Sequence, residues 1–148
     1  MQIYVFSSNN LTNIWAGVGA GMWAVSLKLA KNKGTITKSQ RMQIGSVGVL
    51  YCSETEEFTT PFLVKSLPDT KKEISHVWDK NWGLPFKIAP LGSPIKRLSK
   101  NVVAKELPSV TSSGKNWNKI LYVQPNFSFQ PSTISTEDWA FIYASLCD

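Results

Sequence analysis

Short apolar runs rich in β-branched and aromatic residues recur along the chain, separated by polar, glycine and proline residues. Runs of this kind predict buried strands. Pro85 and Pro90 cannot donate hydrogen bonds to a neighbouring strand, so the run that contains them is expected at a sheet edge or at a bulge. We expect strands over residues 3–6, 22–27, 47–52, 61–66 and 84–91, and a last strand over 120–123.

Apolar residues recur at helical spacing over residues 11–20, between a polar cluster and a glycine. Ser7-Ser8-Asn9-Asn10 precedes this segment and is typical of a helix cap, and Gly21 follows it as a helix end. Gly17 and Gly19 lower the intrinsic helix propensity of the segment. The spacing nevertheless predicts a short helix over 11–20.

A second helical pattern lies at the C-terminus. Residues 135–138 are typical of a helix start with acidic side chains in the first turn, and apolar residues at helical spacing continue to Leu146. The lysine-rich segment 28–38 is expected to be a polar connection. Short strands with a helix near each end predict an α+β (mixed α/β) domain, with a curved sheet or small β-barrel flanked by helices.

Composition and charge narrow the range of partners. The 148 residues suit a single domain, 1–148, with its own hydrophobic core. A net charge of +6 and a pI near 9.4 favour a polyanionic partner, nucleic acid first. The first residues lack the features of a signal peptide, and no apolar run is long enough to span a bilayer. We therefore expect an intracellular, cytoplasmic protein without membrane contact, monomeric as an isolated domain.

Side chains that could carry catalysis or bind a metal are sparse. His76 is the single histidine, and Cys52 and Cys147 form no metal-ligand pattern. The acidic residues in 54–57 are more typical of a solvated turn than of a paired-carboxylate site. The glycine-rich run 17–21 lacks the ending of a phosphate-binding loop. We expect a protein that is not an enzyme and has no cofactor or metal. An enzyme that processes nucleic acid is the alternative from another functional class.

Three tryptophans stand out by their surroundings. Trp78 and Trp82 lie in a stretch of His, Asp, Lys, Asn and Gly typical of a loop, and Trp23 follows a glycine-rich segment. Rigid aromatic faces stack on bases and attract methylated nitrogen, which together with the basic charge suggests a reader of nucleic-acid bases. The plainer alternative is that all three are core residues. Trp15 and Trp139 lie on amphipathic patterns and are expected in the core.

Spaced motifs connect these tryptophans to a known family. Ser8-Asn9-Asn10-x-x-Asn13 is followed by Gly21-x-Trp23. Further along the chain, the loop with Trp78 and Trp82 precedes Phe86-Lys87-Ile88. This order resembles the YTH domain, a PUA-like domain that reads N6-methyladenine in RNA, over most of the chain up to about residue 100. The resemblance implies binding of a methylated base that is single-stranded or flipped out of a duplex.

The resemblance also implies a role for each matched residue. A methylated exocyclic amine needs an apolar slot for its methyl and an acceptor for its remaining proton. In the family the acceptor is a backbone carbonyl, which falls here at Ala24. Asn13 matches the side chain at the N1 edge of the ring, and Ser8 and Asn9 match positions that bond the purine edge. The implied aromatic cage is formed by Trp23, Trp78 and Trp82. On this basis Trp23→Ala is expected to remove the preference for methylated adenine with the fold largely intact.

The chain departs from the family pattern at several positions. Ser7 stands where a lysine is common, and Ala24 stands where serine or cysteine is common. RNA readers of this family have a basic segment that runs from a helix into a loop, and this chain matches it only in part. The candidate phosphate contacts are Lys28, Lys38, Arg41, Lys96, Arg97 and Lys115.

Related families supply alternatives within the same class of function. The EVE domain shares the PUA-like fold and an aromatic pocket, and prokaryotic versions read methylated DNA within modification-dependent restriction systems of the McrB kind. A 5-methylcytosine reader of this type would be favoured if Asn13 pointed away from the pocket. The partner of this chain is thus expected to be RNA or DNA with a methylated base, and the chain could belong to a larger restriction or regulatory protein.

Overall fold

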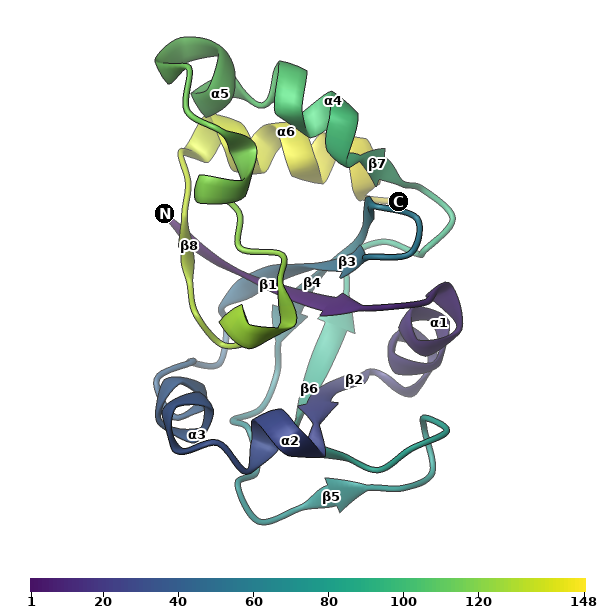
Figure 1. The fold of residues 1–148 in the computed structure, drawn as a ribbon. Coiled ribbons are helices and arrows are strands. Elements are labelled where there is room, and N and C mark those ends of the chain that lie inside the picture. The colour runs from purple at the N-terminus through teal and green to yellow at the C-terminus, as the bar shows by residue number, and fades with distance from the viewer.

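The computed structural model describes the whole chain, residues 1–148, and Figure 1 shows the arrangement of its elements. The strands are β1 (Gln2–Ser8), β2 (Met22–Ser26), β3 (Val47–Cys52), β4 (Glu57–Val64), β5 (Glu73–Ile74), β6 (Trp82–Pro90), β7 (Leu98–Ser99) and β8 (Ser132–Thr133). The α-helices are α1 (Leu11–Ala20), α2 (Leu27–Ala30), α3 (Lys33–Ser39), α4 (Lys100–Glu106), α5 (Pro108–Ser113) and α6 (Thr136–Leu146). Two short 3₁₀ helices are η1 (Trp117–Lys119) and η2 (Pro125–Phe127).

The strands form one mixed, curved sheet in the order β2-β6-β4-β3-β1-β8. In addition, β5 pairs with β6 and β7 pairs with β4. β1 runs parallel to β3, from Tyr4 opposite Gly48 to Ser8 opposite Cys52, and all other pairs are antiparallel. A parallel pair needs a long crossover, which the helices and the strand between β1 and β3 supply. The predicted mixed α/β class with a curved sheet and flanking helices is confirmed.

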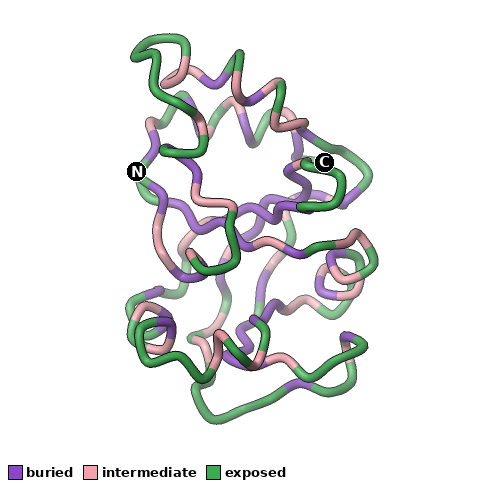
Figure 2. Tube along the Cα trace, in the orientation of Figure 1, coloured by how far each residue is buried: buried purple, intermediate pink, exposed green.

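The hydrophobic core has two parts, one on each side of β1. Tyr4 and Phe6 belong to the first core, together with Phe62, Phe86 and Trp23. The neighbouring residues Ile3 and Val5 belong to the second core, beneath α4 and α6. Side chains alternate between the faces of a strand, so a strand covered on both faces appears as an uninterrupted apolar run. Figure 2 shows the resulting band of buried residues through the middle of the molecule. None of the helices has the length and hydrophobicity required to cross a bilayer.

Helix α1 begins and ends where the sequence predicts. The Asn10 side chain accepts a hydrogen bond from the Asn13 amide at 2.8 Å, which satisfies one of the free N–H groups of the first turn. Gly21 ends the helix in the left-handed conformation at φ 65°, where a side chain would cost energy.

The segment 28–38 is not the polar connection expected from its lysines, because most of it lies in α2 and α3. Each helix begins at a capping side chain. Ser26 accepts a hydrogen bond from the Leu29 amide at 3.4 Å, and Asn32 accepts one from the Thr35 amide at 3.1 Å. Leu29 also packs against the first core. A cap and a few apolar contacts thus stabilise helices too short to give a clear periodic pattern.

The strand expected over residues 120–123 is also wrong. Ile120 and Leu121 are buried in the second core, but they follow η1 in an irregular segment. The amide of Tyr122 donates instead to the Ser132 hydroxyl, at 3.1 Å. The edge of β1 pairs with β8, a strand of only two residues. Ile120 and Leu121 are therefore apolar because they are buried in the second core, and not because they belong to a strand.

Strand β6 lies in the interior of the sheet, between β2 and β4, and not at an edge. The alternative prediction, a bulge, is confirmed for Pro85, whereas Pro90 pairs with Phe62 in regular register at the end of β6. The register with β2 shifts between Trp23 and Val25, and Leu84, immediately before Pro85, has a left-handed φ of 54°. An irregular stretch tolerates a residue without an N–H donor, so Pro85 fits an interior strand.

The expectation that Trp15 is a core residue is wrong, because 45% of it is exposed. Helix α1 is instead anchored by Ile14 and Gly17, which are its buried residues. Trp139 is partly buried and packs against the second core, in agreement with its expected place.

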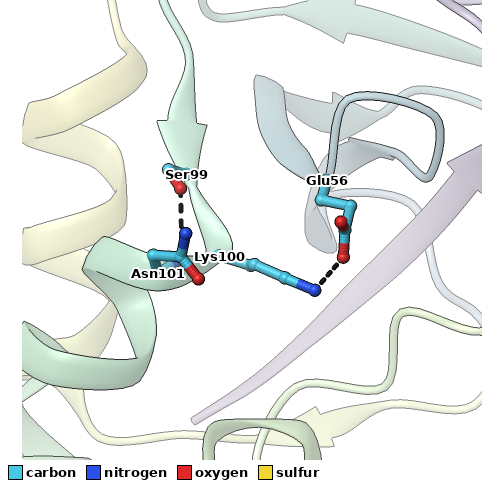
Figure 3. A network of polar contacts seen from close by, with 4 residues as sticks. All are labelled: Glu56, Ser99, Lys100 and Asn101. Atoms are coloured by element: carbon cyan, nitrogen blue, oxygen red, sulfur yellow. Dashed lines mark hydrogen bonds and ion pairs between the residues drawn. The ribbon is translucent and has the colours of Figure 1, made fainter.

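The acidic residues of the β3–β4 turn are engaged with basic residues next to β7 and α4. Glu56, which has a left-handed φ of 57°, pairs with Lys100, and Figure 3 shows this contact beside the Ser99 cap of α4. Glu57 pairs with Arg97 at 3.5 Å. Both contacts are partly exposed, where ion pairs contribute about 0–1 kcal/mol. They place these carboxylates in a surface turn and not in a paired catalytic site.

Helix α6 begins with a buried carboxylate. Asp138 accepts hydrogen bonds from the amide and hydroxyl of Ser109 at 2.8 and 2.5 Å, and from the amide of Ser135 at 3.1 Å. Burial raises the pKa of this carboxyl, but the hydrogen bonds from Ser109 and Ser135 outweigh burial and hold the pKa below its ordinary value. Asp138 thereby links α5 to α6 through its ionised form.

Asp138→Asn is expected to lower the free energy of unfolding at neutral pH by about 1–3 kcal/mol, because the amide replaces an acceptor of several hydrogen bonds. A depressed pKa stabilises the folded protein above the unfolded-state value near about 4, and this contribution is lost as pH falls through the folded-state pKa. Urea denaturation at neutral and at acidic pH measures the difference, which is expected to shrink in acid. Glu137→Gln, which removes an exposed charge from the same turn, is the control. If the loss of unfolding free energy in Asp138→Asn did not change with pH, this would contradict the inference that Asp138 stabilises the fold in its ionised form.

Candidate functional site

The residues predicted to form the aromatic cage and to bond the base edge lie near the end of β1 and the paired strands β2 and β6. In the β2–β6 register Trp23 lies opposite Phe86, and Ser26 lies opposite Trp82. Trp78, in the loop before β6, folds back onto α1, and its Nε1 donates to the Asn13 carbonyl at 2.9 Å. Pairing of two strands and one loop-to-helix hydrogen bond therefore bring together tryptophans that are far apart in the sequence.

The three tryptophans form one tightly packed cluster. The rings of Trp78 and Trp82 stack with centroids 4.3 Å apart and an interplanar angle of 11°. Trp23 meets both rings edge to face, at 5.7 and 5.6 Å. Trp23 is 1% exposed and Trp78 is 5% exposed, whereas Trp82 is half-buried. The Trp78 and Trp82 rings thus cover one another's facing surfaces. The burial of Trp78 is a feature that we expected of the plainer alternative, a structural aromatic core.

An open hollow of about 320 Å³, here called the main hollow, lies against this cluster. It has the size of a small-molecule site, which is typically about 300–1,000 Å³. Its walls contain four predicted contact residues besides Trp82. These are Ser8, Asn9, Trp23 and Ala24. Trp78 does not line the main hollow.

Asn13 lines a separate hollow of about 220 Å³, here called the Asn13 hollow. Asn9 and Trp82 line both hollows, so the two hollows are neighbours. The side-chain amide of Asn13 forms no hydrogen bond within the protein and is free to bind a ligand. The structure thus brings Asn13 next to the tryptophan cluster, but in a different hollow from Trp23.

Ala24 differs from the other residues of β2 in its strand pairing. Ala24 is buried, and it has no partner residue in the β2–β6 ladder because the register shifts at this position. On β1, Ser7 lines the main hollow, and its buried hydroxyl has no hydrogen-bond partner. Unpaired buried polar atoms are rare in folded proteins.

Several wall residues of the main hollow carried no signal in the sequence. Leu29 comes from α2, within the segment expected to be a connection. Pro125 begins η2, and Ser128 follows its last residue. Residues 125–128 are about a hundred positions from β1 in the chain, and only the tertiary fold brings them to the site. Ser7 was visible only as a departure from a family pattern.

The candidate phosphate contacts are spread over the surface. Lys28 is exposed on α2, next to Leu29 of the main hollow. Lys96 donates to the Cys147 carbonyl at 2.7 Å, and Arg97 pairs with Glu57, so both take part in structural contacts. Lys115 is exposed just after α5. Lys38 and Arg41 line a further hollow of their own.

The glycine that weakened the predicted helix has a packing role. A Cβ atom at Gly17 would lie 2.6 Å from Cε3 of Trp23, so α1 can approach this ring only with glycine here.

Gly17→Ala is expected to lower the free energy of unfolding by about 1–3 kcal/mol through overpacking, despite a better helix propensity. Gly19 lies two residues away on the same helix, and a Cβ atom there would have no neighbour within 4 Å. Gly19→Ala is therefore the control and is expected to stabilise by up to about 1 kcal/mol. Urea denaturation of both variants measures this contrast, and equal shifts would contradict it.

No protein-family model matches the sequence, and no curated protein matches it either. The fold itself, however, is that of YTH domains. The chain superimposes on the apo YTH domain of Toxoplasma CPSF4 with a TM-score of 0.64 and 13% identity, over 99% of this chain and 88% of that one. It superimposes on the Pho92 YTH domain in complex with m6A with a TM-score of 0.62 and 12% identity, over 99% and 87%. It superimposes on the YTH domain of Zygosaccharomyces rouxii MRB1 in complex with N6-methyladenosine RNA with a TM-score of 0.60 and 10% identity, over 97% of this chain and 85% of that one.

Proposed function

We propose that the chain is a reader of a methylated base, N6-methyladenine foremost, within a strand of RNA or DNA. The observation that carries this proposal is the meeting, within a YTH fold, of Trp23, Trp78 and Trp82 with Ser8 and Asn9. Two of the similar YTH domains are in complex with N6-methyladenosine RNA or m6A, which supports the same ligand class here. The net charge of +6 supports a polyanionic strand as the partner.

Insertion of a base requires Trp82 to leave its stack on Trp78. Trp82 is the most exposed of the three rings and lines both the main hollow and the Asn13 hollow, so we expect its movement to join the two. An aromatic pair is worth about 0.5–1.5 kcal/mol beyond its buried area, whereas base–aromatic stacking contributes about 1–3 kcal/mol. A stacked base therefore offsets the separation of the two rings.

The polar groups around the joined hollows suit a methylated adenine. Its methyl group would lie against the tryptophan rings, and its remaining N–H would donate to the Ala24 carbonyl, at the position where the β2–β6 register is broken. The free Asn13 amide would donate to N1 of the ring, and Ser8 and Asn9 would bond the purine edge. A base held in this way must be single-stranded or flipped out of a duplex.

We further propose that this chain acts as a reader and not as an enzyme, and that it does so inside the cell. The structures to which it is similar are YTH domains. Two of its clustered carboxylates are taken up by the Glu56–Lys100 and Glu57–Arg97 contacts, and no group of three or more His, Cys, Asp and Glu side chains is placed to hold a metal ion.

Fluorescence anisotropy with matched oligonucleotides at fixed salt tests the proposal. The panel contains RNA and DNA strands, single and double, that are unmodified or carry N6-methyladenine or 5-methylcytosine. One methyl group in an apolar pocket is worth about 1–3 kcal/mol, so selective binding of roughly tenfold or more to a single-stranded N6-methyladenine strand is expected. Selectivity for 5-methylcytosine would replace this ligand with that of an EVE-like reader. Equal, salt-sensitive binding to every strand would reduce the protein to a basic domain with an aromatic core.

A further inference from the structure

A hollow of about 390 Å³, here called the basic hollow, lies between the first half of β1, the end of α3 and the segment after η2. Gln2 and Tyr4 of β1 form one wall, and Lys38 and Arg41 form another. Residues 129–131 close it. The basic hollow shares no residue with the main hollow.

The two cations of the basic hollow have no acidic partner. The ion pairs of the protein are Arg97–Glu57 and Lys100–Glu56, and no Asp or Glu lines this hollow. The Lys38 ammonium donates at 3.5 Å to the backbone carbonyl of Asn126, which leaves its other protons free. Arg41 is exposed, so its guanidinium can take up the bidentate geometry that suits phosphate. Two unpaired positive charges in one concave site favour an anion.

Neutral donors complete the lining. The Tyr4 hydroxyl forms no hydrogen bond within the protein, and burial raises the pKa of this phenol, so it stays protonated at physiological pH. The side-chain amides of Gln2 and Gln130 add further donors without charge. Donors of both kinds around a cationic pair suit a phosphodiester, which presents several acceptor oxygens and one negative charge.

The basic hollow is connected to the main hollow through two shared segments. On β1, Ser7 and Ser8 line the main hollow, whereas Gln2 and Tyr4 line the basic hollow. Around η2, residues 125 and 128 line the main hollow and 129–131 line the basic hollow. Figure 1 shows the green segment that contains η2 crossing β1, above α2 and α3. The two hollows therefore draw their walls from the same two segments, β1 and residues 125–131.

We propose that the basic hollow is a second subsite for nucleic acid, which binds the phosphate of a nucleotide that flanks the base held by the tryptophan cluster. This inference rests on the proposed function, because it gives the strand a path from the main hollow across η2. Lys38 and Arg41 supply the phosphate contacts, and Tyr4 and the glutamine amides supply neutral hydrogen bonds. Of the six candidate phosphate contacts predicted from the sequence, Lys38 and Arg41 are the two that lie on this path.

The test compares the wild type with Lys38→Ala/Arg41→Ala. The probes are N6-methyladenosine alone and single strands of about ten nucleotides with one central N6-methyladenine or none, as RNA and as DNA. Each phosphate contact on a single strand contributes about 0.7 to the slope of log K against log salt, so the double variant is expected to lower that slope by about 0.7–1.4. Roughly tenfold weaker binding of the strands at physiological salt is expected, with nucleoside binding unchanged.

Lys105→Ala/Lys119→Ala is the matched control. It removes the same charge from exposed positions that line no hollow, and it is expected to leave the salt slope unchanged. The inference is overturned if the two double variants lose the same affinity, if the salt slope of Lys38→Ala/Arg41→Ala equals that of the wild type, or if its nucleoside binding falls as much as its strand binding. Failure of the proposed function has a different signature. The wild type would then bind methylated and unmethylated strands equally, while the salt slopes on unmodified strands would still report on the basic hollow.

Discussion

Trp82→Ala is expected to abolish the preference for a methylated base and to weaken binding of the methylated strand by roughly 5- to 150-fold. The ring is the shared wall of the main hollow and the Asn13 hollow, and it is the partner that a bound base would stack on in place of Trp78. Loss of one base–aromatic stack costs about 1–3 kcal/mol, or roughly 5- to 150-fold in Kd. Anisotropy titrations with methylated and unmethylated single strands measure both the affinity and the preference.

Two variants accompany this measurement. Trp15→Ala removes an exposed tryptophan of α1 that lines no hollow, and it is expected to keep both affinity and preference. Trp82→Phe keeps an aromatic face and is expected to retain part of the preference. Because Trp82 is half-buried, its removal leaves the core largely in place, and circular dichroism can verify the fold. An unchanged preference in Trp82→Ala would remove this residue from the site.

Trp23→Ala is expected to lower the free energy of unfolding by about 3–5 kcal/mol, the range for truncation of a buried aromatic residue. Trp23 is among the largest fully buried side chains, packs against Gly17 of α1 and meets the other two tryptophans edge to face. Total stabilities of about 5–15 kcal/mol make such a loss severe. The structure therefore revises the expectation that the fold survives this substitution largely intact.

Urea denaturation followed by circular dichroism measures the effect of Trp23→Ala. Trp23→Phe separates packing from recognition, because it keeps most of the buried volume and is expected to cost less stability than alanine. Trp15→Ala is the reference for an exposed tryptophan and is expected to change stability by less than about 1 kcal/mol. If Trp23→Ala were as stable as Trp15→Ala, Trp23 could not be the centre of the first core.

Elements with strong local signals were predictable. Helix α1 has its cap at Asn10 and its end at Gly21, β3 is an uninterrupted apolar run, and α6 begins with a capping box at Ser135. In each case the signal lies within a few residues of the element that it predicts. The helices at 27–39 have caps at Ser26 and Asn32 but are too short to give a clear periodic pattern. The irregular segment at 120–123 is apolar because Ile120 and Leu121 pack into the second core, and not because it forms a strand.

The candidate residues of the site were selected by the resemblance of their motifs to the YTH domain. Ser8, Asn9 and Asn13 surround the start of α1, and Trp23 follows at the spacing of that family. Their three-dimensional relation was not accessible in this way. Whether Trp15 faces the core depends on which side of α1 meets the sheet, and Gly17 lets α1 approach the ring of Trp23 on β2.

The sequence alone was therefore sufficient for the fold class and the helix ends, since these depend on side-chain period and on caps a few positions away. The aromatic residues were nominated by their polar neighbours and by the resemblance to the YTH domain. Tertiary packing decided that Trp78 stacks on Trp82, that Asn13 and Trp23 line two different hollows, and that the segment around η2 contributes to two hollows. These relations depend on the pairing of β2 with β6 and on the crossing of η2 over β1. Contacts between residues so far apart in the chain leave no local pattern in the sequence.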